Sequence, residues 1–301
     1  MNTSVKIAGV TFKNPVTVAS GTFGSGMEFA EFVDLNRLGA VTTKGVATVP
    51  WPGNPTPRIA ETPSGMMNAI GLQNPGVDIF IKRDLNFLYG YDTRIIANIV
   101  GKSIDEYCEV AKKLSETKVD MFEANISCPN VKSGGIAFGT DPKMVEEITR
   151  AIKASTNKPV VMKLSPNVTS ITEMARAAER GGADAISLIN TITGMKIDIH
   201  KRTFAIKNKT GGVSGPAIHP IAVRMVYEAS HAVDIPVIGM GGIACVEDAI
   251  EMMLAGATMV SVGTANFRNP AVTMEIVDGI EEYMRKYEID DINGIIKGVH
   301  E

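Results

Sequence analysis

Residues 160–190 read VVMKLSPNVTSITEMARAAERGGADAISLIN and contain one complete strand–helix–strand pattern. The two ends, 160–164 and 185–190, are short apolar runs of the kind found in parallel strands that are buried on both faces. Between them, Ser170 and Glu173 have the spacing of a capping box, which predicts a helix that begins directly after Ser170. A strand, a helix and a second strand in this order predict a parallel βαβ unit.

The same pattern of an apolar run, a polar turn and a helical segment recurs along the chain. Further helix starts are predicted at Ser103, Asp141 and Asn269, where a capping side chain precedes a helix-favouring sequence. Strands that are each followed by a helix predict an α/β fold, a single (β/α)8 TIM barrel, and a doubly wound open sheet is the competing arrangement. The eight predicted strands are 16–20, 40–44, 94–100, 121–127, 160–164, 185–190, 236–239 and 259–263.

Three segments extend this simple pattern. Residues 5–13 are predicted to form an N-terminal hairpin ahead of the first barrel strand. Two connections, 48–74 and 192–217, are too long for ordinary turns and predict functional insertions. Because no linker, charge block or low-complexity tract interrupts the chain, we expect residues 1–301 to form one domain.

The composition excludes several classes of protein. With 21% charged residues and a formal net charge of −3, the chain has no basic excess that would indicate nucleic-acid or anionic-membrane binding. No apolar run is long enough to span a bilayer, and the N-terminus lacks the pattern of a signal peptide. Three cysteines do not make a disulfide framework, which indicates a reducing compartment. We therefore expect a cytoplasmic protein with no membrane or nucleic-acid partner.

Polar residues and glycines follow the predicted strands, where a barrel of this kind has its active site. Buried strands would place these polar groups inside the mouth of the barrel, where they need partners. Glycines after the seventh and eighth strands predict one phosphate site, with ordinary glycine turns as the alternative. The strand-end residues are Ser20, Lys44, Gly45, Asn98, Asn125, Lys163, Asn190 and Thr191, and the predicted phosphate site comprises Gly241, Gly242, Gly263 and Thr264.

The three cysteines differ in their surroundings. Cys128 follows the fourth predicted strand and precedes a glycine-containing segment, 133–139, that is expected to act as a lid. A thiol at this rim can serve as a base if its surroundings favour the thiolate. Cys108, within an amphipathic helix, and Cys245, beside the phosphate loop, are expected to be packing residues.

The lysines that end two predicted strands allow two chemistries. Lys44 and Lys163 could balance negative charge on a cofactor, or Lys163 could form a Schiff base in an aldolase. The four histidines are scattered along the chain without metal-ligand spacing, so no metal site is expected.

Four motifs together resemble dihydroorotate dehydrogenase: NISCPN at 125–130, MNAIGLQN at 67–74, MKLSPN at 162–167 and LINT at 188–191. The resemblance extends from the opening hairpin to the last helix. It implies a barrel that binds one FMN per chain and oxidises (S)-dihydroorotate to orotate in pyrimidine (UMP) biosynthesis.

The resemblance also implies roles for individual residues. Cys128 would take the C5 proton while hydride passes from C6 to flavin N5, and cysteine at this position implies the soluble class 1. The positions that match substrate contacts are Lys44, Asn68, Ala69, Ile70, Gly71, Leu72, Asn125, Asn190 and Thr191. Those that match flavin contacts are Ser20, Lys44, Gly45, Asn98, Asn125, Lys163, Ile189, Gly215, Gly241, Gly242, Gly263 and Thr264, with Lys163 beside the N1/O2 edge and Lys44 touching both ligands.

The segments NVKSGG at 130–135 and IIANIVG at 95–101 are most similar to the NAD-linked type, class 1B. This similarity implies a homodimer within a heterotetramer whose second subunit carries FAD and a 2Fe–2S cluster. Such a cluster takes four thiolates, and the three cysteines of this chain are consistent with its lying on the partner. The alternatives are a fumarate-dependent class 1A enzyme, a dihydropyrimidine dehydrogenase-like enzyme, a Schiff-base aldolase and a non-catalytic phosphate-binding barrel.

Overall fold

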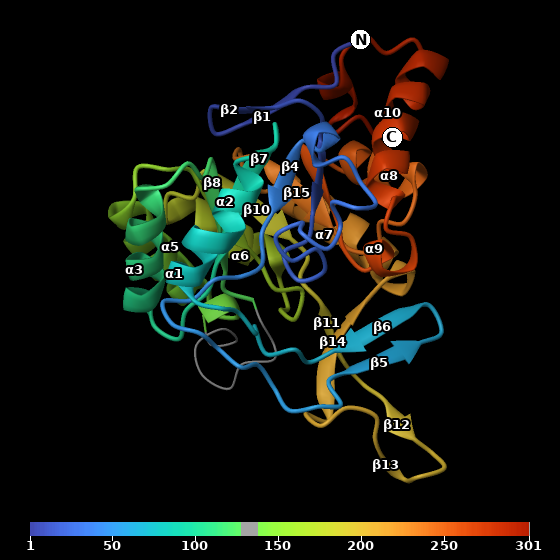
Figure 1. Ribbon diagram of the computed structural model, residues 1–301. Coiled ribbons are helices and arrows are strands. Elements are labelled where there is room, and N and C mark those ends of the chain that lie inside the picture. The colour runs from blue at the N-terminus through green and yellow to red at the C-terminus, as the bar shows by residue number, and fades with distance from the viewer. Residues whose placement is uncertain (128–137, 301) are drawn as a thin grey trace.

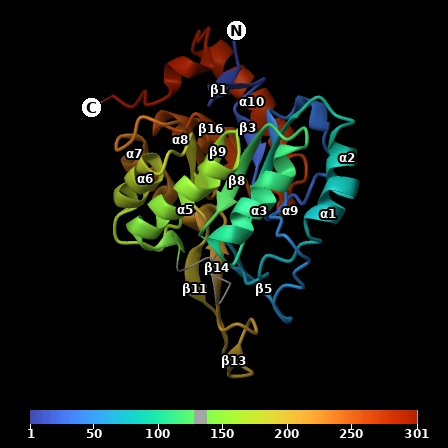
Figure 2. The same cartoon turned by 90° about the vertical axis from the view of Figure 1, so that its left-hand side faces the viewer.

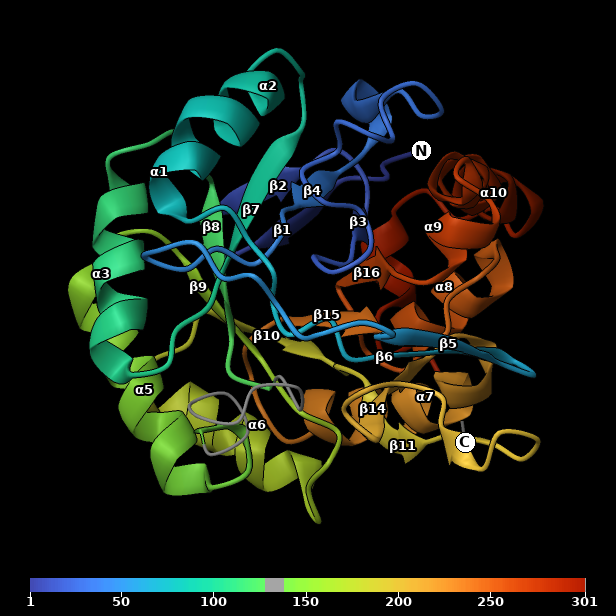
Figure 3. The same ribbon diagram turned by 60° about the horizontal axis from the view of Figure 1, so that its bottom comes forward.

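Eight parallel strands form the centre of the molecule, and helices surround them (Figures 1 and 3). The structure is a computed structural model and describes residues 1–127 and 138–300. All eight predicted barrel strands are confirmed, and nearly all of their residues are buried, as parallel strands between a filled interior and a ring of helices require. They are β3 (Val16–Val18), β4 (Ala40–Thr42), β7 (Arg94–Ile99), β8 (Met121–Asn125), β9 (Val160–Lys163), β10 (Ala185–Leu188), β15 (Val237–Met240) and β16 (Met259–Val262).

The barrel closes between its first two strands. Hydrogen-bonded ladders run in the order β3–β16–β15–β10–β9–β8–β7–β4, which leaves β3 and β4 at the two ends. Across this seam, Gly39 N donates to Val16 O at 3.1 Å, and Thr17 Oγ1 donates to Ala40 O at 3.0 Å. The strands thus form a (β/α)8 barrel, as predicted, and not an open sheet.

Helices follow seven of the eight barrel strands, and three of the four predicted helix caps are confirmed. Ser103, Asp141 and Ser170 accept hydrogen bonds from the backbone N–H groups of the first helical turns. The helical segments after β4 are α1 (Val77–Ile79), η2 (Phe80–Leu85), α2 (Asn86–Leu88), α3 (Ile104–Ser115), α5 (Pro142–Ser155), α6 (Ile171–Arg180), η3 (Pro216–Ile218), α7 (His219–Ser230), α8 (Val246–Leu254), α9 (Ala265–Arg268), α10 (Val272–Lys286) and η4 (Ile292–Ile295). Figure 2 shows α3, α5 and α6 side by side on one flank of the barrel.

Two helix predictions were wrong. The last helix begins at Val272, because Asn269 caps a turn instead: its Oδ1 accepts from Ala271 N at 3.1 Å. The connection between β3 and β4 contains only the short 3₁₀ helix η1 (Leu35–Arg37). Here Gly24 and Gly26 have φ values of 61° and 86°, which break a right-handed helix.

The hairpin and both insertions are confirmed, and the insertions join into one sheet. β1 (Val5–Ile7) pairs antiparallel with β2 (Val10–Phe12) in the N-terminal hairpin. The first insertion supplies β5 (Ile59–Thr62) and β6 (Gly65–Asn68), and the second supplies β11 (Ile192–Met195) and β14 (Thr210–Ser214). Together they form an antiparallel sheet in the order β11–β14–β6–β5, which lies at one end of the barrel (Figure 1).

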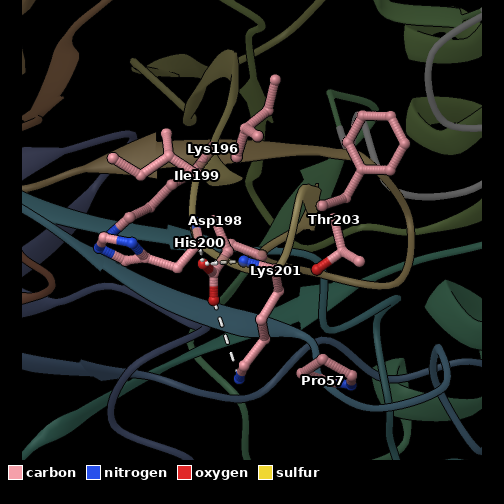
Figure 4. Close-up of a pocket in the computed structure, with 10 residues that line it drawn as sticks. Pro57, Lys196, Asp198, Ile199, His200, Lys201 and Thr203 are labelled. Atoms are coloured by element: carbon pink, nitrogen blue, oxygen red, sulfur yellow. Dashed lines mark hydrogen bonds and ion pairs between the residues drawn. The ribbon is translucent and has the colours of Figure 1, made fainter.

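The second insertion also forms a protruding hairpin from β12 (Ile197–Asp198) and β13 (Thr203–Phe204) (Figures 1 and 2). Its turn is fixed by Asp198 Oδ1, which accepts from the backbone N–H groups of His200 and Lys201, each at 3.0 Å (Figure 4). A pocket lies along this hairpin, but none of the predicted site residues lines it.

Candidate active site

The barrel places the predicted strand-end residues on adjacent strands, with Asn125 and Lys163 level with each other and Asn98 two residues deeper. Asn98 of β7 lies opposite Glu123 of β8, and Asn125 of β8 lies opposite Lys163 of β9. Ser20, Asn98, Asn125 and Lys163 are all buried. Buried polar groups need hydrogen-bond partners, which a bound ligand can supply. We therefore take the C-terminal end of the barrel strands, where these groups gather, as the candidate active site.

A buried carboxylate that the sequence analysis did not single out lies at the centre of this group. Glu123 is 2% exposed, and its Oε1 accepts from Asn98 Nδ2 at 2.6 Å. Its Oε2 accepts from Ser187 Oγ at 2.8 Å, and Lys163 Nζ lies 3.7 Å from Oε1. The Glu123 carboxylate, inside the barrel, therefore balances the positive charge of Lys163.

Asn98 presents an acceptor for which the described residues offer no hydrogen-bond partner. Its Nδ2 is bonded to Glu123, while its buried Oδ1 has no partner among residues 1–127 and 138–300. A Cβ at Gly45 would lie 2.7 Å from this oxygen, so glycine at this position avoids a clash with it. Asn98 Oδ1 can accept a hydrogen bond, and the Lys163 ammonium can donate one. The pair suits a planar ring whose edge carries an N–H group next to a hydrogen-bond acceptor.

Three predicted substrate residues are linked through Ser127, which the sequence analysis did not propose as a site residue. Ser127 Oγ donates to Asn125 Oδ1 at 3.0 Å and accepts from Asn190 Nδ2 at 2.8 Å. Asn190 Oδ1 in turn accepts from the backbone N–H of Thr191 at 2.9 Å. These contacts fix the orientation of both asparagine amides. The only sequence signal for Ser127 was its place inside the NISCPN motif.

The substrate motif of the first insertion is held near this cluster by the insertion sheet. Asn68 Nδ2 donates to Gly212 O at 3.4 Å, and Gly212 lies against the side chain of Thr191. Further along, Ala69 O accepts from Asn54 Nδ2 at 3.0 Å, and Leu72 packs with Trp51. The predicted residues Asn68, Ala69, Ile70, Gly71 and Leu72 therefore form a fixed segment beside the mouth of the barrel.

The predicted phosphate residues come from three neighbouring segments. Thr264 Oγ1 donates to Ser214 Oγ at 2.6 Å, which connects the end of β16 to the residue before Gly215. Gly241 and Gly242 follow the neighbouring strand β15, with φ values of 129° and 74°. Glycine is favoured at both positions because they have left-handed backbone conformations.

His219 anchors the Gly241–Gly242 loop and was missed by the sequence analysis. Its Nδ1 lies 2.9 Å from Gly241 O, and its Nε2 lies 3.1 Å from Glu251 Oε2 and 3.7 Å from Asp248 Oδ1. His219 gathers with two carboxylates, a grouping that the spacing of the histidines along the chain could not show. Both ring nitrogens already face hydrogen-bond acceptors, so the contacts describe an anchor for the loop. The absence of a metal stays a prediction.

The cysteine predictions have different outcomes. Cys128 and the predicted lid up to residue 137 lie outside the described residues, so the base and the lid stay predictions. Cys108 is half-buried in α3, and burial raises the pKa of its thiol. Cys245 is exposed at the start of α8, so its prediction as a packing residue was wrong.

Comparison with known proteins decides the family. Residues 2–284 match the family described as dihydroorotate dehydrogenase. The chain belongs to the dihydroorotate dehydrogenase family. A relative from Lachnoclostridium phytofermentans is 69% identical over 296 residues, which are 98% of this chain and 99% of that protein. One from Alkaliphilus oremlandii is 62% identical over 295 residues, 98% of each protein, and both are named dihydroorotate dehydrogenase B (NAD(+)), catalytic subunit.

A solved structure also shares the fold of this family member. The crystal structure of a dihydroorotate dehydrogenase from Eimeria tenella, in complex with ferulenol, matches with a TM-score of 0.83 at 22% sequence identity. The match covers 98% of this chain and 88% of that chain, so it supports the barrel architecture over its full length. Within the residues that the structure describes, no helix is both long enough and apolar enough to cross a membrane.

Proposed function

We propose that this chain is the catalytic subunit of an NAD-linked, class 1B dihydroorotate dehydrogenase, which oxidises (S)-dihydroorotate to orotate in pyrimidine biosynthesis. The observation that carries the proposal is the 69% identity, over nearly the whole chain, to a protein named as that subunit. The acceptor–ammonium pair of Asn98 and Lys163, beside the amide cluster around Ser127, fits the two ligands that this reaction needs.

The residues of the candidate active site suit both ends of FMN, the flavin ring and the phosphate. The pyrimidine ring of a flavin offers an N–H group for Asn98 Oδ1 and an N1/O2 edge for Lys163, and its phosphate suits the backbone of the glycine loops. When bound, FMN supplies the hydride acceptor of the reaction. The proposed FMN residues are Ser20, Lys44, Gly45, Asn98, Asn125, Lys163, Ile189, Gly215, Gly241, Gly242, Gly263 and Thr264.

The product, orotate, is a planar anion, substrate and product both carry several amide-like edges, and asparagines both donate and accept hydrogen bonds. Asn125 and Asn190 have orientations fixed by Ser127, and Asn68 is tied to Gly212, so these amides are held ready for such a ligand. Ala69, Ile70, Gly71, Leu72 and Thr191 complete the proposed substrate site. Lys44 would balance the charge of the substrate carboxylate.

We assign the base to Cys128, which would take the C5 proton as a thiolate. The Cys128→Ser variant should retain its flavin and oxidise dihydroorotate far more slowly at neutral pH, with activity recovering at high pH, because a hydroxyl ionises much less readily than a thiol. Cys108→Ser, in helix α3, is the matched control and should keep the wild-type rate. Wild-type activity of Cys128→Ser at neutral pH would contradict the assignment.

The name of the relatives, catalytic subunit, indicates a second subunit for those proteins. For this chain we propose a partner that carries FAD and a 2Fe–2S cluster and passes electrons to NAD. The proposed assembly is a cytoplasmic heterotetramer built on a homodimer, in which residues 1–301 form one FMN-binding domain.

Purification from the native cell tests the subunit arrangement. Copurification of an iron–sulfur flavoprotein, with NAD reduced by dihydroorotate, is the expected result. Fumarate reduction by the barrel alone would indicate the class 1A type instead. Borohydride trapping of a sugar phosphate on Lys163, in a protein without flavin absorbance, would favour the aldolase alternative.

A further inference from the structure

The barrel interior contains a carboxylate, that of Glu123, which is not among the proposed substrate or FMN contacts. Glu123 lies in β8 and reaches partners on three other strands: Asn98 of β7, Lys163 of β9 and Ser187 of β10. Both of its oxygens are occupied, and only 2% of the residue is exposed. A charged group this deep is retained only when it is paired and hydrogen-bonded, so its three partners explain how Glu123 is stable there.

The contact with Asn98 fixes which end of that amide faces the site. An ionised carboxylate only accepts hydrogen bonds, so the NH2 end of Asn98 must point toward Glu123. The other end, Oδ1, is then the atom left without a partner among the described residues. Glu123 thereby makes Asn98 an acceptor toward any ligand in the barrel mouth.

The contact with Lys163 has a different character. The separation of 3.7 Å is longer than a hydrogen bond, so the pair is held by charge. Apart from this ion pair, the structure gives the Lys163 side chain no hydrogen bond to the residues that it describes, so its N–H groups remain available to a ligand. Because both groups are buried, their attraction is screened less than that of a surface pair.

We propose that Glu123 is a positioning residue that orients Asn98 and Lys163 and lowers the net positive charge beside the bound flavin. This inference rests on the proposed function, because the ligand in question is FMN. Replacing Glu123 by Gln would leave the Lys163 charge unbalanced and would let the Asn98 amide turn over. An unbalanced ammonium stabilises a reduced, anionic flavin more than an oxidised one, so flavin reduction becomes easier.

The test compares three variants of the full chain with wild type by two measurements, the dissociation constant of FMN and the reduction potential of the bound flavin. For Glu123→Gln we expect about a tenfold weaker FMN affinity and a more positive potential. Ser187→Ala is the matched control: it removes one hydrogen bond to Glu123 but no charge, so the potential should stay at the wild-type value. Glu123→Asp keeps the charge but draws it back from both Asn98 and Lys163, so it should weaken FMN affinity several-fold and shift the potential in the same direction as Glu123→Gln but by less.

The outcomes separate the two proposals. Wild-type protein that binds no FMN would contradict the proposed function itself. Wild-type protein that binds FMN, with Glu123→Gln matching it in both affinity and potential, would contradict only the role of Glu123. If Glu123→Gln is insoluble, Glu123→Asp decides the question: wild-type affinity together with a wild-type potential would overturn the proposal.

Discussion

Asn68 lies directly opposite Gly212 in the pairing of β6 with β14, and its Nδ2 donates to Gly212 O at 3.4 Å. The two residues come from different insertions, which four of the eight barrel strands separate along the chain. Gly212 also lies against the side chain of Thr191, which follows β10. One backbone position of the insertion sheet therefore links two parts of the proposed substrate site.

The first prediction follows from this packing. In Gly212→Ala, the new Cβ would lie 2.5 Å from Thr191 Cβ, so Thr191 would have to move. We expect orotate to bind about tenfold more weakly or worse, because the half-buried Thr191, once displaced, loses its interaction with the ligand. Titration of orotate against the flavin absorbance measures this change.

Gly294→Ala is the control for this variant, since a Cβ at Gly294 would meet nothing within 4 Å. It should bind orotate like wild type. If Gly212→Ala also keeps wild-type affinity, Thr191 has no part in substrate binding or the loop adapts without cost.

The seam of the barrel gives a prediction about stability. A Cβ at Gly39 would lie 3.0 Å from both Asn14 Oδ1 and Val16 O, and would crowd Asn14 O still more closely. Gly39 N donates to Val16 O and to Asn14 Oδ1, each at 3.1 Å, so the strain falls on the bonds that close β3 against β4. Gly39→Ala should lower the free energy of unfolding by about 2 kcal/mol or more. Urea denaturation measures this free energy, and a Gly39→Ala midpoint equal to that of the control variant Gly294→Ala would contradict the prediction.

The sequence predicted the barrel well because its signals are local. Each strand is an apolar run that the fold buries on both sides, and Ser103, Asp141 and Ser170 mark helix starts through contacts within a single turn. The helix start predicted at Asn269 was wrong because an asparagine side chain can cap a turn as readily as a helix. The pairing of β6 with β14 involves residues far apart in the chain, so no local pattern could predict it.

The proposed site rests on sequence motifs and stays a prediction, and the contacts that the sequence did not predict join residues far apart in the chain. Ser127 and His219 act through partners on other strands and helices, for which the sequence has no local signal. Glu123 did leave a signal. A glutamate inside an otherwise apolar strand is rarely buried unless it is paired, so its position in 121–127 should have predicted a partner at the site.

The role of His219 in holding the Gly241–Gly242 loop can be tested separately for each of its two ring nitrogens. In His219→Asn, the amide NH2 lies near the place of Nδ1 and can still donate to Gly241 O, whereas the amide of His219→Gln reaches the place of Nε2 near Glu251. We expect His219→Asn to keep near-wild-type FMN affinity and His219→Gln to lose about tenfold, the effect of one or two hydrogen bonds. FMN fluorescence titration measures both, and equal affinities of the two variants would show that the bond to Gly241 does not support the loop.

The last prediction concerns the reactivity of Cys245. Partial burial of the sulfur, together with the nearby Glu247 and Asp248 carboxylates, raises the pKa of this thiol from 9.0 to about 11. A raised thiol pKa means that less thiolate is present at every pH below it, and the thiolate is the reactive form. Although Cys245 is exposed, its alkylation by iodoacetamide should be slow at about pH 8 and should rise about tenfold per pH unit up to about pH 10.

Peptide mapping by mass spectrometry after timed alkylation follows Cys245 separately from the other cysteines. Glu247→Gln removes one of the carboxylates that raise the pKa, so Cys245 should react faster in this variant at each pH and level off earlier. A wild-type rate that already levels off near pH 9, as for an unperturbed thiol with a pKa of 9.0, would contradict the raised pKa. The comparison also separates chemistry from access, because Glu247→Gln changes the charge beside the sulfur and leaves the exposure of Cys245 nearly the same.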